Sequence, residues 1–265
     1  MLTLGIDIGS ASSKAVVLED GKVIRADGVV ESGTGTSGKA RVLEEVLGKA
    51  GVTLAEIGYT VATGYGRISV REANEQISEI TCHARGVAFE CPNARTVVDI
   101  GGQDVKAISL LNSRGEVKDF IMNDKCAAGT GRFLENISRV LEIGIDKMAE
   151  HYFRSTNPAH VSSTCAVFAE SEVVSLLSDG VALDDIVAGV HHMIAIRASA
   201  LARHAGLVDD IVMTGGVARD AGVVDAISKN VGHKVLVAPH AQLTGALGAA
   251  VLAYQYSKKK ALVMK

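Results

Sequence analysis

The chain has 265 residues, of which 48% are hydrophobic and 22% are charged, and this composition is typical of a packed globular protein. The formal net charge of −3, without any block of Lys and Arg, argues against nucleic acid as a partner. The chain starts without the basic region of a signal peptide, and no apolar run is long enough to span a membrane. We therefore expect a cytoplasmic protein with no membrane partner.

Strand-like and helix-like patterns alternate along the chain, which predicts an α/β protein. The first strand is expected directly at the N-terminus, in the apolar run Leu2–Ile6. Helices are expected, in chain order, at Ser37–Ala50, Gln76–Phe89, Gly129–Glu142, Thr164–Ser178, Leu183–Ala205, Asp220–Val231 and Gln242–Tyr254.

One pattern, D-I-G-x-x-x-x-K-A, occurs twice: DIGSASSKA begins at Asp7 and DIGGQDVKA begins at Asp99. Each copy lies between two apolar runs, which predicts a β-hairpin with the aspartate at the end of its first strand. A later apolar run in each half ends in Thr-Gly, at Thr63 and at Thr214. The repeats predict two copies of one α/β unit facing a cleft, with a ligand at the strand ends.

The two halves differ in length, because 56 positions separate Asp7 from Thr63 and 115 separate Asp99 from Thr214. We expect one lobe to comprise residues 1–95 and a C-terminal helix at about 241–265. The second lobe, 96–240, would then carry the extra segment and two of the four cysteines.

Glycine-rich turns at strand ends suit a nucleoside triphosphate, because their N–H groups can donate to phosphate oxygens. Carboxylates at the same ends can hold Mg²⁺ through its waters, and Lys14 or Gln103 could contact phosphate or orient a water. The predicted catalytic residues are Asp7, Asp99, Gln103 and Asp104, and the predicted nucleotide-binding residues are Gly9, Ser10, Ala11, Ser12, Ser13, Lys14, Gly101, Gly102, Gly215, Gly216 and Val217. The simpler alternative is that each D-I-G is only a hairpin turn.

The segment GTGTSGK, residues 33–39, matches the spacing of a P-loop. Ala40 then occupies the place of the hydroxyl that would bind Mg²⁺, so we expect a loop that caps the helix from Ser37 instead. The GYGR segment, residues 64–67, could line the cleft or merely turn the chain.

The four cysteines fall into two pairs, and in a cytoplasmic protein they are not expected to form disulfides. Cys126 and Cys165 each stand at a predicted helix start, where free N–H groups and the helix dipole favour a thiolate. Cys82 and Cys91 lie nine positions apart in a helix-like segment, near opposite faces, and are interpreted as small buried apolar side chains. Metal ligation by Cys126 and Cys165 remains one of several possibilities at this point, because neither belongs to a C-x-x-C pair.

Six segments in order, GIDIGSASSK, DIGGQD, NDKCAAGTGRF, SSTCAVFAESEV, MTGGVARD and QLTGALGAA, together resemble the ATP-dependent activators of (R)-2-hydroxyacyl-CoA dehydratases. These proteins are also called component A, initiators or archerases. Their wider family includes ATPase subunits of benzoyl-CoA reductase and reductases of double-cubane cluster proteins. The resemblance covers nearly the whole chain.

The resemblance implies a duplicated ribonuclease-H-like fold, shared with acetate and sugar kinases, Hsp70 and actin, around a nucleotide cleft. It implies a homodimer in which Cys126 and Cys165 of each subunit hold one [4Fe-4S] cluster. It also implies that MgATP hydrolysis drives one electron from ferredoxin or flavodoxin into a dehydratase under anaerobic conditions, starting a radical loss of water. The rival functions are the same electron transfer to a benzoyl-CoA reductase or double-cubane protein, and a small-molecule kinase of the same fold.

Three charged residues near the cysteines have no role assigned by sequence alone. Glu170 and Glu172 follow Cys165 on a predicted helix, and we interpret them as helix-surface charges. Arg132 could form an ion pair or contact a partner.

Overall fold

The computed structural model describes residues 1–162 and 165–263. The chain forms two compact units, each built around a five-stranded sheet. The first unit comprises Met1–Ala94, Leu110–Lys118 and Ala238–Lys265, and the second comprises Arg95–Ser109 and Asp119–Val237.

The first sheet has the strand order β3-β2-β1-β4-β5. The antiparallel hairpin β1–β2 is followed by an antiparallel β3, and β4 lies parallel to β1 on its other side. The strands are β1 (Leu2–Ile8), β2 (Ser13–Glu19), β3 (Val23–Val30), β4 (Tyr59–Thr63) and β5 (Glu75–Gln76). The helices of this unit are α1 (Gly38–Ala50), α2 (Glu79–Glu90) and α8 (Thr244–Val263), with short 3-10 turns at Leu54–Glu56 and Arg67–Ser69.

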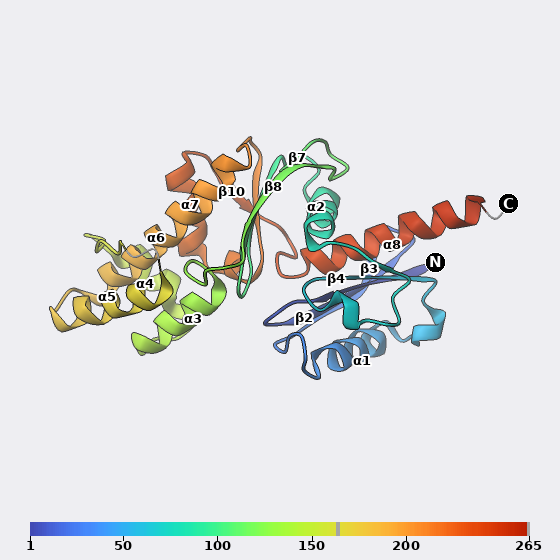
Figure 1. The fold of residues 1–265 in the computed structure, drawn as a ribbon, viewed down its shortest axis with the longest axis horizontal. Helices are drawn as coiled ribbons and strands as arrows, with labels where there is room; N and C mark the ends of the chain where they lie inside the picture. Colours follow the sequence, from blue (N-terminus) through green and yellow to red (C-terminus); the bar gives the residue numbers. More distant parts are fainter. Residues whose placement is uncertain (163–164, 264–265) are drawn as a thin grey trace. The chain divides into compact units, whose positions relative to one another are not determined.

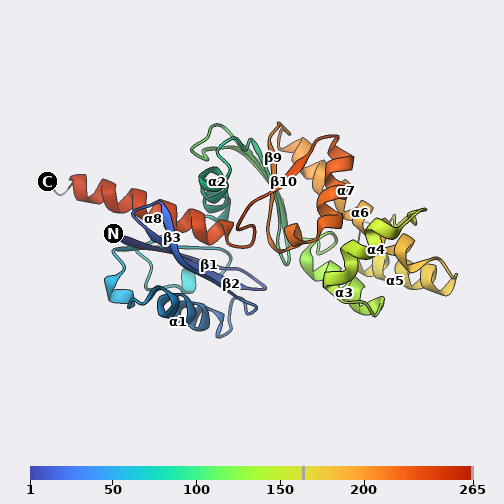
Figure 2. The same cartoon turned by 180° about the vertical axis from the view of Figure 1, so that it is seen from behind.

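Both faces of the first sheet are covered at its centre, which explains why β1, β2 and β4 are buried almost without alternation. Successive side chains of β2 point to opposite faces. Ala15 and Val17 pack in a core with Val42 and Val46 of α1, whereas neighbouring Val16 packs with residues of α8. Figures 1 and 2 show α1 on one side of the blue strands and the red α8 on the other.

The α8 helix approaches its neighbours closely because glycines lie at the points of contact. A Cβ added at Gly248 would overlap the carbonyl oxygen of Cys82 in α2. A helix with a larger residue there could not pack in this position. The C-terminal helix is therefore built into the core of the N-terminal unit.

The second sheet has the order β10-β9-β6-β7-β8 and repeats the central arrangement of the first. Its hairpin β6–β7 is antiparallel, and β9 lies parallel to β6 with Asp99 opposite Thr214, as Asp7 is opposite Thr63. The strands are β6 (Thr96–Ile100), β7 (Val105–Leu110), β8 (Val117–Asn123), β9 (Ile211–Thr214) and β10 (Val235–Val237). The predicted duplication of one α/β unit is confirmed.

The helices of the second unit are α3 (Gly131–Val140), α4 (Met148–Arg154), α5 (Ala166–Ser178), α6 (Leu183–His204) and α7 (Ala221–Val231), with 3-10 turns at Ile145–Lys147 and Gly216–Arg219. The long helix α6 packs against α4 and α7, and α3 packs against α5. In the described part of the chain, no helix combines the length and apolarity needed to cross a membrane.

Helices occur at all seven predicted places, with corrections at their ends. The second begins at Glu79, because Gln76 belongs to β5 and Ser78 caps the helix by accepting from the Thr81 amide. The seventh continues past Tyr254 to Val263. Thr164, the predicted start of the fourth, lies outside the described residues. The α4 helix was not predicted, because its seven residues are too few to show a helical period.

Candidate nucleotide turns and cysteine centre

The first aspartate turn joins β1 to β2. Asp7 is buried at the end of β1, opposite Lys14 in the hairpin, and the Lys14 Nζ lies 3.4 Å from its Oδ2. The Gly9 amide donates to the Ser12 carbonyl at 3.0 Å and closes the turn. An ion pair and a backbone bond therefore fix the shape of this turn.

The segment with P-loop spacing and the residue before it are hydrogen-bonded to the first aspartate turn. The amide and hydroxyl of Thr34 donate to the Gly9 carbonyl at 2.9 and 3.1 Å, and the Ser13 hydroxyl donates to the Ser32 carbonyl at 2.7 Å. The loop caps α1 as expected: Ser37 is the N-cap residue, although its own side chain makes no capping hydrogen bond. The Thr36 hydroxyl accepts from the Gly38 amide instead, at 3.1 Å.

The second aspartate turn, between β6 and β7, is organised by a buried lysine. The Lys106 Nζ lies 3.1 Å from Asp99 Oδ2 and 2.7 Å from Asp104 Oδ1. The Thr214 hydroxyl donates to the other oxygen of Asp99 at 2.8 Å. The Gly101 amide closes the turn by donating to the Asp104 carbonyl at 3.0 Å. Gln103, in contrast, is exposed at the tip.

Lys106 was not among the predicted site residues, although the repeat contained the signal. It occupies the same place in the second D-I-G-x-x-x-x-K-A as Lys14 does in the first. Its side chain is only 3% exposed, compared with 15% for Lys14. A buried ammonium requires paired charges, and Asp99 and Asp104 supply them.

The Thr-Gly strand ends lie directly beside the aspartate strands. Gly215 has a φ of 88°, and a Cβ there would overlap the Ile100 carbonyl oxygen at the end of β6. Gly64 has a φ of 84°, and a Cβ there would overlap the Asp7 carboxylate. Only glycine satisfies both the left-handed backbone and the close approach. Gly216 and Val217 continue from Gly215 into the 3-10 turn.

The GYGR segment packs against the end of β1. The Gly66 amide donates to the Ile8 carbonyl at 2.8 Å, and the Arg67 guanidinium donates to the Gly64 carbonyl at 3.0 Å. In each unit, the predicted nucleotide-binding residues therefore lie at the ends of the central strands.

The four cysteines occupy different environments. Cys82 is fully buried in α2, and burial raises the pKa of its thiol to about 12. Cys91, predicted to be buried, is half-buried at the C-terminal end of α2, where burial also raises its pKa. Cys126 and Cys165 are half-buried in the second unit.

The helix-start prediction is right for Cys165 and wrong for Cys126. Cys165 is the N-cap residue of α5. Cys126 lies in the loop after β8, five positions before the first residue of α3, Gly131. The Arg197 guanidinium, on α6, lies beside its sulfur and donates to the Cys126 Sγ at 3.5 Å.

The Cys126 loop is tied to the second aspartate turn through the main chain. The Gly131 amide donates to the Gly101 carbonyl at 2.9 Å, and the Arg132 amide donates to the Gly102 carbonyl at 3.0 Å. The first amides of a helix have no partner within the helix, and here the turn supplies two. Gly101 and Gly102 are therefore in direct contact with the segment that follows Cys126.

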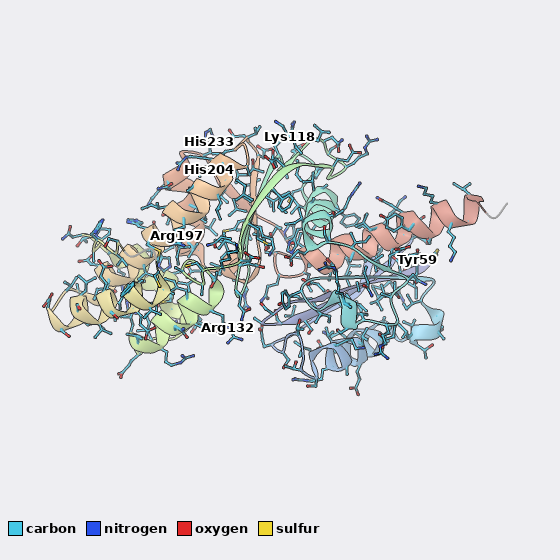
Figure 3. All side chains as sticks on the ribbon, in the orientation of Figure 1. Tyr59, Lys118, Arg132, Arg197, His204 and His233 are labelled. Atoms are coloured by element: carbon cyan, nitrogen blue, oxygen red, sulfur yellow. The ribbon has the colours of Figure 1, made fainter. Side chains whose placement is uncertain are left out.

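Two charged residues near the cysteines have structural partners. The Glu172 carboxylate accepts from the Ser162 amide at 3.1 and 3.3 Å and from its hydroxyl at 3.2 Å, so it anchors the segment before Cys165 rather than serving as a simple surface charge. Arg132, on α3 in Figure 3, forms an exposed ion pair with Glu135 at 3.7 Å.

The thiols of one chain fit half of an iron–sulfur site. A [4Fe-4S] cluster takes four thiolates, and Cys126 and Cys165, both in the second unit, could supply two of them. Across residues 1–162 and 165–263, no three His, Cys, Asp or Glu side chains gather into a metal site. For Mg²⁺, the most exposed of the three aspartates is Asp104, whose side chain is 25% exposed and bound to Lys106.

The sequence model of the BadF/BadG/BcrA/BcrD ATPase family matches residues 4–253. The chain belongs to this family. It is 57% identical over 260 residues to the activator of lactoyl-CoA dehydratase of Anaerotignum propionicum, covering 98% of this chain and 100% of that one. It is 50% identical over 258 residues to the (R)-2-hydroxyglutaryl-CoA dehydratase activating ATPase of Acidaminococcus fermentans, covering 97% and 98%.

Solved structures of the family confirm the predicted fold. The activator of the 2-hydroxyisocaproyl-CoA dehydratase from Clostridium difficile, with bound ADPNP, has a TM-score of 0.95 at 46% identity, covering 100% of this chain and 98% of that one. A glucokinase of the ROK family from Streptomyces griseus, at 15% identity and a TM-score of 0.59, shares the fold alone, covering 96% of this chain and 100% of that one. The fold of this ATPase is thus the duplicated ribonuclease-H-like fold of sugar kinases, Hsp70 and actin.

Proposed function

We propose that this ATPase is an iron–sulfur activator that passes one low-potential electron from ferredoxin or flavodoxin to a (R)-2-hydroxyacyl-CoA dehydratase, and so starts a radical dehydration. Relatives 57% and 50% identical over nearly the whole chain carry the names of dehydratase activators. The observation that carries the proposal is the main-chain contact of Gly101 and Gly102 with Gly131 and Arg132, because it joins the second aspartate turn to the Cys126 loop.

The nucleotide would be ATP or ADP with Mg²⁺, held by the two aspartate turns. The Gly9 and Gly101 amides already close their own turns, so we assign the phosphate donors to the following amides of Ser10–Ser12 and Gly102–Gln103. Lys14 would neutralise phosphate charge, and Asp104 would hold a water-coordinated Mg²⁺. Gly215, Gly216 and Val217, which follow β9, would contact the rest of the nucleotide.

The redox centre would be one [4Fe-4S] cluster shared by two copies of the chain. Each copy offers Cys126 and Cys165, and a two-fold axis doubles these two thiolates to the required four. When bound, the cluster supplies a one-electron carrier. Arg197 beside Cys126 and Glu172 behind Cys165 would hold the two ligand segments in place.

Anaerobic purification tests this proposal directly. The protein should be brown and contain about four irons and four sulfides per dimer. Cys126→Ser and Cys165→Ser should each lose the cluster, whereas the controls Cys82→Ser and Cys91→Ser should retain it. A colourless, iron-free protein that still hydrolyses ATP would exclude the activator function.

The partner is tested by ATP-dependent reduction of candidate proteins. A dehydratase should accept electrons only in the presence of the activator, a low-potential donor and MgATP. Reduction of a benzoyl-CoA reductase or a double-cubane protein instead would reassign the partner but keep the electron-transfer role. Transfer of the γ-phosphate to a small hydroxyl compound would replace the proposal with a kinase function, for which the glucokinase likeness supports the fold alone.

A further inference from the structure

The contact between Arg197 and Cys126 joins two segments that lie 71 positions apart in the chain. The guanidinium donates to the Cys126 sulfur at 3.5 Å, within the range of a hydrogen bond to sulfur. The loop also lies along the aliphatic part of the arginine, since a Cβ added at Gly129 would be 3.6 Å from Arg197 Cδ. Arg197 therefore contacts the cysteine loop with both its charge and its stem.

Arg197 projects from one of the best-anchored elements of the second unit. The α6 helix spans 22 residues, and Ile194, Ala195 and Ala198 around Arg197 are almost fully buried. Figure 3 shows Arg197 on this helix, whereas Cys126 lies in a loop between β8 and α3. A side chain from a well-packed helix thus contacts the sulfur of a loop cysteine.

We propose that Arg197 is a positioning residue that fixes the Cys126 sulfur and raises the reduction potential of a cluster bound through it. This inference rests on the proposed function, because it requires Cys126 to be a cluster ligand. An N–H donor to a ligand sulfur stabilises the reduced cluster, which carries one more negative charge. Arginine keeps its charge at all relevant pH values, so the donor is always available.

The test compares four anaerobically purified proteins: wild type, Arg197→Gln, Arg197→Lys and Arg203→Gln. Iron content and the midpoint potential from a spectroscopic redox titration are measured for each. Arg197→Gln should shift the potential to a more negative value, and Arg197→Lys should shift it less, because the charge remains. Arg203→Gln removes the same charge from the same helix, where Arg203 donates to the Asn230 carbonyl at 2.6 Å, and should leave the potential unchanged.

The outcomes separate the inference from the proposed function. A cluster in Arg197→Gln with the wild-type potential would overturn the role of Arg197 and leave the activator function standing. Loss of iron in Arg197→Gln that Arg197→Lys restores would support it. If Arg197→Gln does not fold, Arg197→Lys decides, and an unchanged potential in it overturns the inference. A wild-type protein without iron would overturn the proposed function itself.

Discussion

Lys106 places a buried positive charge between the two carboxylates of the second aspartate turn. Charges removed from water are costly, so each of the three groups depends on the others for compensation. Lys14 and Asp7 form the corresponding pair in the first turn, but their Nζ–Oδ2 distance is 3.4 Å and Lys14 is more exposed. The two turns are therefore alike in sequence, but the stability of the folded protein should depend more on Lys106 than on Lys14.

Replacing Lys106 with Met should strongly destabilise the protein. The change leaves Asp99 and Asp104 without their cation, and breaking a buried pair in this way costs about 3–5 kcal/mol. Lys14→Met is the matched control and should cost clearly less, because water reaches that pair. Chemical denaturation measures both losses. Equal losses in the two variants would contradict the difference in burial on which this prediction rests.

Among the elements, α8 packs closely on two neighbours in the first unit. It contacts β1 of the sheet at Gly5, and it approaches α2 at Gly248. Glycine is unfavourable inside helices, so its presence here reflects packing rather than helix propensity. Gly48 in α1 provides the opposite case, because nothing lies within 4 Å of a Cβ added there.

The substitutions Gly248→Ala and Gly48→Ala should therefore have opposite effects on stability. At position 48, alanine should stabilise by about 0.5–1 kcal/mol through its better helix propensity. At position 248, the same methyl group overlaps the Cys82 carbonyl and should destabilise by about 1–3 kcal/mol. Thermal unfolding of the two variants is the measurement. A stabilised Gly248→Ala would show that α8 does not pack as described.

The two main-chain hydrogen bonds between the second aspartate turn and α3 lead to a prediction about amide exchange. If phosphate binds the turn, hydrogen–deuterium exchange at the Gly131 and Arg132 amides should slow when ADP is added, because their acceptors Gly101 and Gly102 become fixed. The Val224 amide, bonded to Asp220 within the start of α7, is the control and should not change. Unchanged exchange at Gly131 and Arg132 despite saturating ADP would mean that these hydrogen bonds do not transmit binding.

In the whole molecule, the aspartate turns and the cysteines are separate sets of residues. Each unit contains one aspartate turn, whereas Cys126 and Cys165 belong to the second unit alone. Loss of the cysteines should accordingly leave nucleotide binding intact.

The double variant Cys126→Ser/Cys165→Ser should retain the thermal stabilisation by ADP. A ligand at 100 times its Kd stabilises the folded state by about 2.7 kcal/mol, so the Tm should rise as it does for apo wild type. Gly215→Val is the negative control, because it combines a left-handed φ of 88° with an overlap at the Ile100 carbonyl. A double variant that no longer responds to ADP would show that the two sets depend on each other.

The duplicated plan of this protein is readable from its amino-acid sequence. The repeated D-I-G pattern and the paired Thr-Gly endings record local requirements, namely a tight hairpin after a buried strand and a backbone that only glycine adopts. Such requirements act within a few residues, so they remain visible in the chain as written. The six motifs that indicate the ATPase family are of the same local kind.

The residues that contact these motifs from distant parts of the chain became visible only in the folded protein. The burial of Lys106, the contact of Arg197 with Cys126 and the bonds from α3 to Gly101 and Gly102 depend on how elements pack. Cys126 was expected at a helix start, but in the folded protein it lies in a loop beside an arginine 71 positions away. A local sequence pattern predicts which face of a helix or strand is buried. The side chain that packs against that face comes from a distant part of the chain, and residue spacing does not predict which one it is.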